Sequence, residues 1–129
     1  MTWIVLKTRH FHRWARKAGL SDKALSDAVI EMGNGLIDAD LGGGIVKKRV
    51  ALPGHGKRGS TRTLLATNCD DRWIFVFGFE KNKRANISDR ELEALKLLAG
   101  DLLSLSAAQI AEAVDNGHLL EVSNETRQD

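Results

Sequence analysis

The apolar run WIFVFGF at residues 73–79 constrains the fold more than any other stretch of this chain. Its side chains are apolar at odd and even positions alike, and its aromatic and β-branched content is typical of a strand. A strand with this pattern needs cover on both faces. We therefore predict that it lies centrally in a sheet, with helices covering one side.

Four further strands are predicted from short apolar or β-branched runs. Pro53-Gly54-His55-Gly56 and Asp70-Asp71 supply turns between neighbouring runs, and residues 38–44 form a glycine-rich turn. Short turns between adjacent strands favour an antiparallel arrangement. The four strands are expected at residues 2–6, 45–52, 60–68 and 119–122.

Four helices are predicted from apolar residues at helical spacing. Gly19 is expected to end the first helix, and Ser21, Ser88 and Ser106 to begin the others. Ser88 also opens a capping box with Glu91. The helices are expected at residues 10–18, 21–33, 88–103 and 106–115. The predicted fold class is α+β, an antiparallel sheet with an N-terminal helix pair and C-terminal helices.

Length and composition bound the organisation of the chain. Its 129 residues favour a single domain over residues 1–129, with a frayed tail at 124–129. Hydrophobic residues make up 43%, which is too many for a disordered chain. Cys69 is the only cysteine, so no intramolecular disulfide can form. The sequence has no signal-peptide pattern and no apolar run of about 18 residues, so we expect a soluble cytoplasmic protein without a membrane span.

Charge is distributed unevenly along the chain. Residues 45–62 hold six Lys and Arg residues, and no Asp or Glu occurs in residues 42–68. Residues 1–88 hold 16 basic and 8 acidic residues, whereas residues 89–129 hold 3 and 9. A basic body with an acidic tail favours binding of an anionic polymer on one face. The alternative is that both parts simply solvate their surfaces.

Three basic clusters are the candidate functional residues. In the predicted sheet they can converge on one face, where Lys and Arg would contact phosphates. Strand alternation sends Lys47 and Arg49 to one face and Lys48 to the other. The alternative is that these lysines protect a strand edge from aggregation. The clusters are Lys47, Lys48 and Arg49; Lys57, Arg58 and Arg62; and Lys81, Lys83 and Arg84.

Several kinds of site lack a sequence signature. The chain has no glycine-rich phosphate-binding motif, and no Cys/His pair has the spacing of zinc ligands. We therefore expect neither a nucleotide cofactor nor a metal. His10 and His12 are two residues apart on a helix, so they point apart and are interpreted as surface residues.

Two stretches carry a family resemblance over nearly the whole chain. They are ADLGGGIVKKRVALPGHGKRGSTRTLLA and DRWIFVFGFEKNKRANISDRELEALKLLA. With FHRWARKAGLSDKALSDAV and GHLLEV, they resemble the RelE/HigB-type toxins of bacterial type II toxin–antitoxin systems, in the RelE/ParE superfamily. The resemblance implies a compact RelE-like domain with a twisted antiparallel sheet. It also implies a metal-free, ribosome-dependent mRNA endonuclease in which the ribose 2′-OH attacks the adjacent phosphate.

The resemblance also implies roles for single residues. Arg62 matches the strand arginine that clamps the scissile phosphate, and Lys81 matches the cation after the central strand. The basic hairpin of the family corresponds to Lys48, Arg49, Lys57 and Arg58. Catalytic roles therefore fall on Arg62, Lys81 and Lys57. RNA-binding roles fall on Lys47, Lys48, Arg49, Arg58, Lys83 and Arg84.

The sequence departs from the family at two aromatic positions. Thr61 stands where an aromatic residue usually precedes the arginine, and Ile87 falls near the place of a C-terminal tyrosine, which this chain lacks altogether. Trp73 or Phe79 could replace the missing stacking surface. The general base is unassigned, because His55 is a candidate only by residue type and also fits an incidental loop histidine.

The implied partners are a cognate antitoxin with a helix-turn-helix domain, the ribosome and mRNA, with operator DNA bound only through the antitoxin. Two alternatives remain open. The chain could be a non-catalytic toxin that resembles gyrase poisons on the same fold, or an inactive module that only binds the antitoxin and regulates its promoter.

Overall fold

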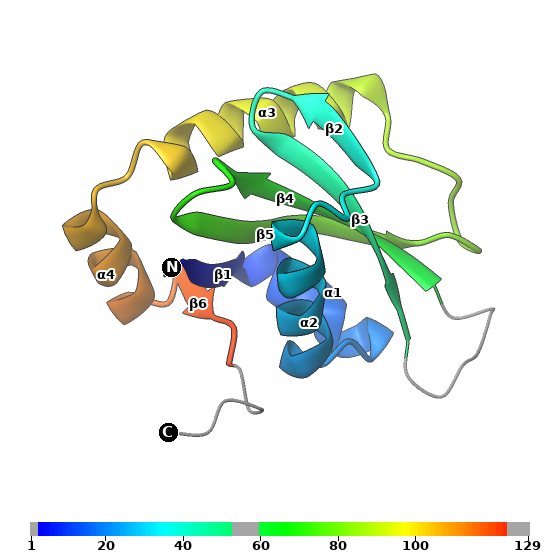
Figure 1. Ribbon diagram of the computed structural model, residues 1–129, viewed down its shortest axis with the longest axis horizontal. Helices are drawn as coiled ribbons and strands as arrows, with labels where there is room; N and C mark the ends of the chain where they lie inside the picture. The colour runs from blue at the N-terminus through cyan, green and yellow to red at the C-terminus, as the bar shows by residue number, and fades with distance from the viewer. Residues whose placement is uncertain (1–2, 53–59, 124–129) are drawn as a thin grey trace.

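The computed structural model describes residues 3–52 and 60–123, which form six strands and four helices (Figure 1). The strands form one sheet in the order β2-β3-β4-β5-β1-β6. In chain order the elements are β1 (Ile4–Thr8), α1 (Arg9–Ala18), α2 (Asp22–Gly33), β2 (Ala39–Gly42), β3 (Ile45–Ala51), β4 (Ser60–Thr67), β5 (Arg72–Glu80), α3 (Asp89–Leu103), α4 (Ala107–Asp115) and β6 (Leu119–Glu121).

Helices cover both faces of the sheet, which makes three layers (Figure 1). Trp73 and Phe75 of β5 pack into one core with α1 and α2, whereas Ile74 and Val76 pack into a second core with α3 and α4. The prediction that β5 lies inside the sheet is confirmed. The prediction of helices on one side was wrong, because the C-terminal helices cover the face that the N-terminal pair leaves open.

The sheet is mixed. The middle strands β3, β4 and β5 pair antiparallel as predicted, whereas β1 runs parallel to β5. The segment at residues 38–44 is also more than a turn, because β2 lies within it and pairs with β3. Gly42, Gly43 and Gly44 have φ angles of 85°, 62° and 85°, a left-handed region that favours glycine, and they reverse the chain between these strands. The α+β class with helices at both ends of the chain is confirmed.

The predicted helix boundaries rest on cap residues that the structure confirms. Ser88 and Ser106 each accept a backbone hydrogen bond at the start of α3 and α4, and both helices have a complete capping box. Ser21 begins α2 in the same way, and Gly19 ends α1 with a φ of 89°. Local sequence therefore determines where each helix begins.

No single helix in residues 3–52 and 60–123 is long and apolar enough to cross a membrane. Only α3 and α4 together pass that test by length and composition, and the chain bends by 111° between them. The turn predicted at Pro53–Gly56 and the frayed tail predicted at 124–129 lie outside the described residues.

Candidate functional site

Arg49 and Arg62 are direct cross-strand partners in the β3–β4 register. Leu64, two residues after Arg62, packs into the core beneath α3, so strand alternation places the arginine pair on the α3-side face of the sheet. Like charges directly opposite each other on neighbouring strands destabilise a sheet. An anion bound between the two guanidinium groups would relieve that repulsion.

Local hydrogen bonds orient Arg62. Its Nη1 donates to Oγ of Ser60 at 3.1 Å and to the carbonyl oxygen of Thr61 at 3.5 Å. No ion pair within the described residues involves this side chain. The guanidinium is therefore held in place by neutral groups, and no carboxylate among the described residues neutralises its charge.

A β-bulge directs two phenylalanines onto the same face. The β4–β5 register shifts after Leu64, which pairs with Phe77, so that Phe75 faces the α1 side and Phe77 the α3 side. Phe79 is the cross-strand partner of Arg62 on β5. Bulges commonly re-aim side chains next to functional sites. Here the bulge sets two aromatic rings beside the arginine pair.

Arg84 stacks over these rings. Its guanidinium carbon lies 5.9 Å from the ring centroid of Phe77 and 5.5 Å from that of Phe79. Both carboxylate oxygens of Glu91 accept from Arg84, at 2.6 and 3.2 Å. The His10 ring stacks on Phe77 with centroids 5.8 Å apart and an interplanar angle of 9°. The rings of Phe77 and Phe79 are tilted by 51° to each other and Phe79 is buried, so the outer sides of Arg84 and His10 are the planar groups open to a stacking nucleobase.

The pKa of the Glu91 carboxyl group offers a check of its pairing with Arg84. The hydrogen bond from Arg84, followed by the one from the backbone of Ser88, lowers the pKa of Glu91 from 4.5 to about 2. A lowered carboxyl pKa means that the pair is intact above pH 4.5 and is lost as the pH falls towards 2. We expect the Arg84→Gln variant to raise this pKa towards 4.5, as measured from the Glu91 side-chain carbonyl shift by NMR. An unchanged midpoint would contradict the pairing.

Lys81 and Lys83 follow β5. The backbone N–H of Lys81 donates to the carbonyl oxygen of Ser60 at 3.4 Å, which sets this exposed lysine beside the start of β4 and two residues from Arg62. Lys83 pairs with Glu80 at 3.5 Å and its side chain is 72% exposed. The backbone of Lys81 therefore lies near the arginine pair, whereas the charge of Lys83 is partly neutralised.

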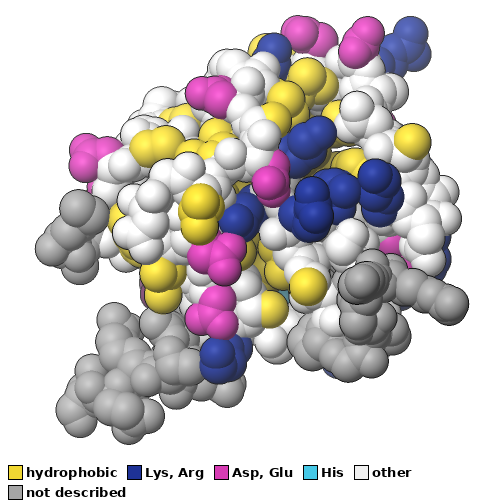
Figure 2. Space-filling model, turned by 45° about the vertical axis from the view of Figure 1, so that its right-hand side comes forward, with side chains coloured by type: hydrophobic (Ala, Val, Ile, Leu, Met, Phe, Trp, Pro, Cys, Tyr) yellow, Lys and Arg dark blue, Asp and Glu magenta, His cyan; other side chains and the backbone are white. Residues whose placement is uncertain are grey.

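We call Lys47, Arg49, Arg62, Lys81 and Arg84, with the rings of Phe77 and Phe79, the cationic site. Figure 2 shows a face of the molecule on which Lys and Arg side chains gather close together, next to hydrophobic side chains. Across residues 3–52 and 60–123, no group of three or more His, Cys, Asp or Glu side chains could hold a metal ion.

A family model described as "RelE toxin of RelE / RelB toxin-antitoxin system" matches residues 4–122. This chain belongs to the RelE toxin family. The match extends from β1 to the end of β6 and so includes the whole described sheet and all four described helices. The RelE toxin is thus a component of a toxin–antitoxin system, and its partner is an antitoxin. A comparison with curated proteins finds no match.

Lys48 lies apart from the cationic site of the toxin. As strand alternation predicts, it faces the α2 side, where it is only 7% exposed. Its Nζ pairs with Glu31 at 2.8 Å and donates to the carbonyl oxygen of Leu36 at 2.9 Å. A buried and paired ammonium has no free access to RNA. The burial and pairing of Lys48 therefore argue against the RNA-binding role expected for it and favour a structural one.

Lys47 and Lys48 form a matched pair for testing this assignment. We expect Lys48→Met to lower the free energy of unfolding by about 1 kcal/mol, because it removes hydrogen bonds from a charged donor to the backbone and to Glu31. It should leave RNA binding unchanged. Lys47→Met should leave stability unchanged and weaken RNA binding. Urea denaturation and binding of an RNA oligonucleotide measure both properties, and the reverse pattern would contradict the assignment.

Three of the predicted site residues, Lys57, Arg58 and His55, lie outside the described residues. Of the two aromatic residues considered as a stacking surface, Trp73 is 1% exposed and packs against Trp3 in the α2-side core. Phe79 lies on the face of Arg62 but is only 4% exposed, so it offers little surface for stacking, whereas Phe77 beside it is partly exposed. The sequence analysis did not assign Phe77 or His10 to the site. Only the bulge and the stacking geometry show that these two residues lie beside Arg84.

Proposed function

We propose that this toxin is a ribosome-dependent mRNA endonuclease whose cationic site binds the scissile phosphate. The pairing of Arg49 with Arg62 carries the proposal, since no ion pair among the described residues involves either side chain, and a phosphodiester spreads its single negative charge over two non-bridging oxygens that two guanidinium groups can contact. Family membership supports it, because RelE toxins are generally endoribonucleases.

The proposed reaction is an intramolecular transfer within RNA. The ribose 2′-oxygen forms a bond to the adjacent phosphorus as its proton leaves, and the bond from phosphorus to the 5′-oxygen of the next nucleotide breaks and that oxygen gains a proton. The products are a 2′,3′-cyclic phosphate and a 5′-hydroxyl. Negative charge grows on the phosphate oxygens in the transition state, where Arg62 and Lys81 would stabilise it.

The platform that Arg84 forms over Phe77 and the buried Phe79 would supply a place for the base beside the scissile phosphate. Stacking of a base on an aromatic side chain contributes about 1–3 kcal/mol and accepts any base. This platform would replace the tyrosine that the chain lacks. Positioning of the RNA would then depend on the bulge in β5.

A ribosome programmed with a defined mRNA tests the proposed function. Purified toxin should produce discrete new 5′ ends in the translated region, and these ends should be absent with free mRNA. Intact mRNA together with breaks in DNA would favour a gyrase poison instead. Intact mRNA and intact DNA, with tight antitoxin binding, would favour an inactive regulatory module.

Repression of the toxin's own promoter would be a separate activity of the complex. We propose that the antitoxin carries a helix-turn-helix domain and that operator DNA binds only through it. A gel-shift assay with the operator should show a complex with toxin plus antitoxin and none with toxin alone.

A further inference from the structure

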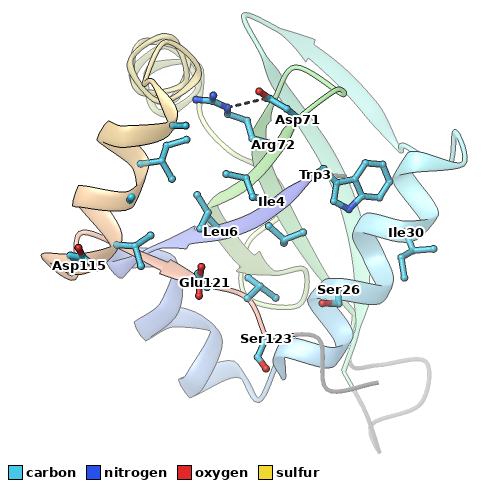
Figure 3. Close-up of a pocket in the computed structure, with 16 residues that line it drawn as sticks. Trp3, Ile4, Leu6, Ser26, Ile30, Asp71, Arg72, Asp115, Glu121 and Ser123 are labelled. Atoms are coloured by element: carbon cyan, nitrogen blue, oxygen red, sulfur yellow. Dashed lines mark hydrogen bonds and ion pairs between the residues drawn. The ribbon is translucent and has the colours of Figure 1, made fainter. Parts of the chain in front are cut away.

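A groove of about 1020 Å³ lies at the β6 edge of the sheet, away from the cationic site over β3, β4 and β5. Figure 3 shows Ile4 and Leu6 of β1 on its floor, with α4 on one side and α2 with Ile30 on the other. Val114 of α4 adds to its apolar lining.

Two exposed isoleucines line this groove. The described residues include four exposed large hydrophobic side chains, and two of them, Ile4 at 41% and Ile30 at 49%, line the groove from separate elements. Single exposed hydrophobic residues are normal on a protein surface, whereas a gathered patch marks an interaction site. The walls are open to solvent at both isoleucines, which fits a segment of another protein better than an enclosed small molecule.

The groove also includes a stretch of uncovered strand edge. The pairing of β6 with β1 ends where the N–H of Val122 donates to the carbonyl oxygen of Val5 at 3.0 Å. The next N–H, that of Ser123, donates to Oδ2 of Asp22 at 2.9 Å and leaves the sheet. Within the described residues, the outer edge of β1 at Trp3 and Ile4 therefore has no paired strand. Uncovered edges favour association with another chain.

The rim of the groove is acidic. The carboxylates of Asp71, Asp115 and Glu121 line it. Its one cationic lining residue, Arg72, is 8% exposed and donates to carbonyl oxygens and to Asp71. Residues 107–123, which include α4 and β6, hold no Lys or Arg. An occupant with complementary charge would place cations around an apolar stripe.

We propose that this groove binds an amphipathic, basic helix of the antitoxin. Its apolar stripe packs on Ile4, Ile30 and Val114, and its flanking Lys or Arg residues pair with Asp115 and Glu121. The partner follows from family membership, and the proposal does not require that the toxin is a nuclease. Because the groove lies at a different edge from the cationic site, the variants below change antitoxin binding without touching the proposed catalytic residues.

Calorimetric titration of this chain with its cognate antitoxin tests the groove. We expect Ile30→Glu to weaken binding at least 30-fold, because it places a carboxylate within the apolar contact. Leu97→Glu is the matched control, since Leu97 is 75% exposed on α3 and lies outside the groove. It should bind within threefold of the parent. Equal affinity for Ile30→Glu and the parent would overturn the proposal.

A separate variant tests the contribution of the acidic rim. Asp115→Lys should weaken antitoxin binding about tenfold and reduce its dependence on salt, because a rim ion pair is replaced by repulsion. Hydrogen exchange should show protection of residues 3–6 and 107–115 in the complex. Protection confined to β3 and β4 would overturn the proposal. So would a dimer of the toxin alone that Ile30→Glu dissociates, because a second copy would then occupy the groove.

Discussion

The Arg62→Ala variant is expected to cleave mRNA on the ribosome about 10²–10³-fold more slowly than the parent, the usual loss when one preorganised donor to a developing anion is removed. Arg62 projects opposite Arg49 and beside Phe79, and its guanidinium is held by Ser60 and Thr61. Under the proposed mechanism, removing it takes away a charge that stabilises the transition state while leaving Arg84 and Phe77 in place.

Single-turnover cleavage of ribosome-bound mRNA measures this effect. Arg62→Lys should recover part of the rate, because an ammonium supplies the charge but not the forked geometry of a guanidinium. Arg16→Ala is the control, since Arg16 is an exposed arginine on α1, outside the cationic site. A parental rate for Arg62→Ala would refute the catalytic role of Arg62.

The Arg62→Ala variant should lose activity without losing stability. Measuring both properties therefore separates a loss of catalysis from a loss of fold. Arg62 and Arg49 repel each other across the strands in the absence of RNA. We therefore expect Arg62→Ala to be as stable as the parent or slightly more stable in urea. A cleavage defect accompanied by unfolding would not support a role in catalysis.

The sequence predicted the elements of this fold because local signals determine them. Helical spacing and the serine caps placed all four described helices, and β-branched runs placed five of the strands. The sixth, β2, is a short strand in a glycine-rich segment, and only its pairing with β3 defines it. The parallel direction of β1 depends on where the strand enters the sheet, which no local pattern records.

The cationic site was predictable in part. Alternation correctly separated Lys47 and Arg49 from Lys48, but burial of Lys48 comes from α2, which is distant in sequence. The side on which Phe77 lies could not be predicted, because a bulge shifts strand parity without a sequence mark. The acidic C-terminal part was interpreted from its charge alone, and only the fold shows that some of its carboxylates line a groove.

Arg72 is a second residue whose role only the structure shows. It is the first residue of β5 and is 8% exposed. Its Nη1 donates to the carbonyl oxygens of Leu102 at 3.0 Å and Leu105 at 2.8 Å, where α3 ends, and its Nε donates to Asp71 at 3.1 Å. A buried cation at a helix C-terminus complements the helix dipole, and here it adds a charged donor to the carbonyl oxygen of Leu102, which also accepts from the N–H of Leu105.

We expect Arg72→Ala to lower the free energy of unfolding by about 3 kcal/mol, because two hydrogen bonds from a buried charged donor are lost and the carbonyl group of Leu105 loses that donor. Asp71→Asn is the control and should cost less than about 1 kcal/mol, since the Asp71 side chain is 56% exposed. Urea denaturation measures both variants. Hydrogen exchange should also show faster opening at residues 102–106 in Arg72→Ala. If its stability equals that of Asp71→Asn, the contacts of Arg72 with the end of α3 contribute little, and packing of Leu102 and Ala99 on the sheet alone holds that helix in place.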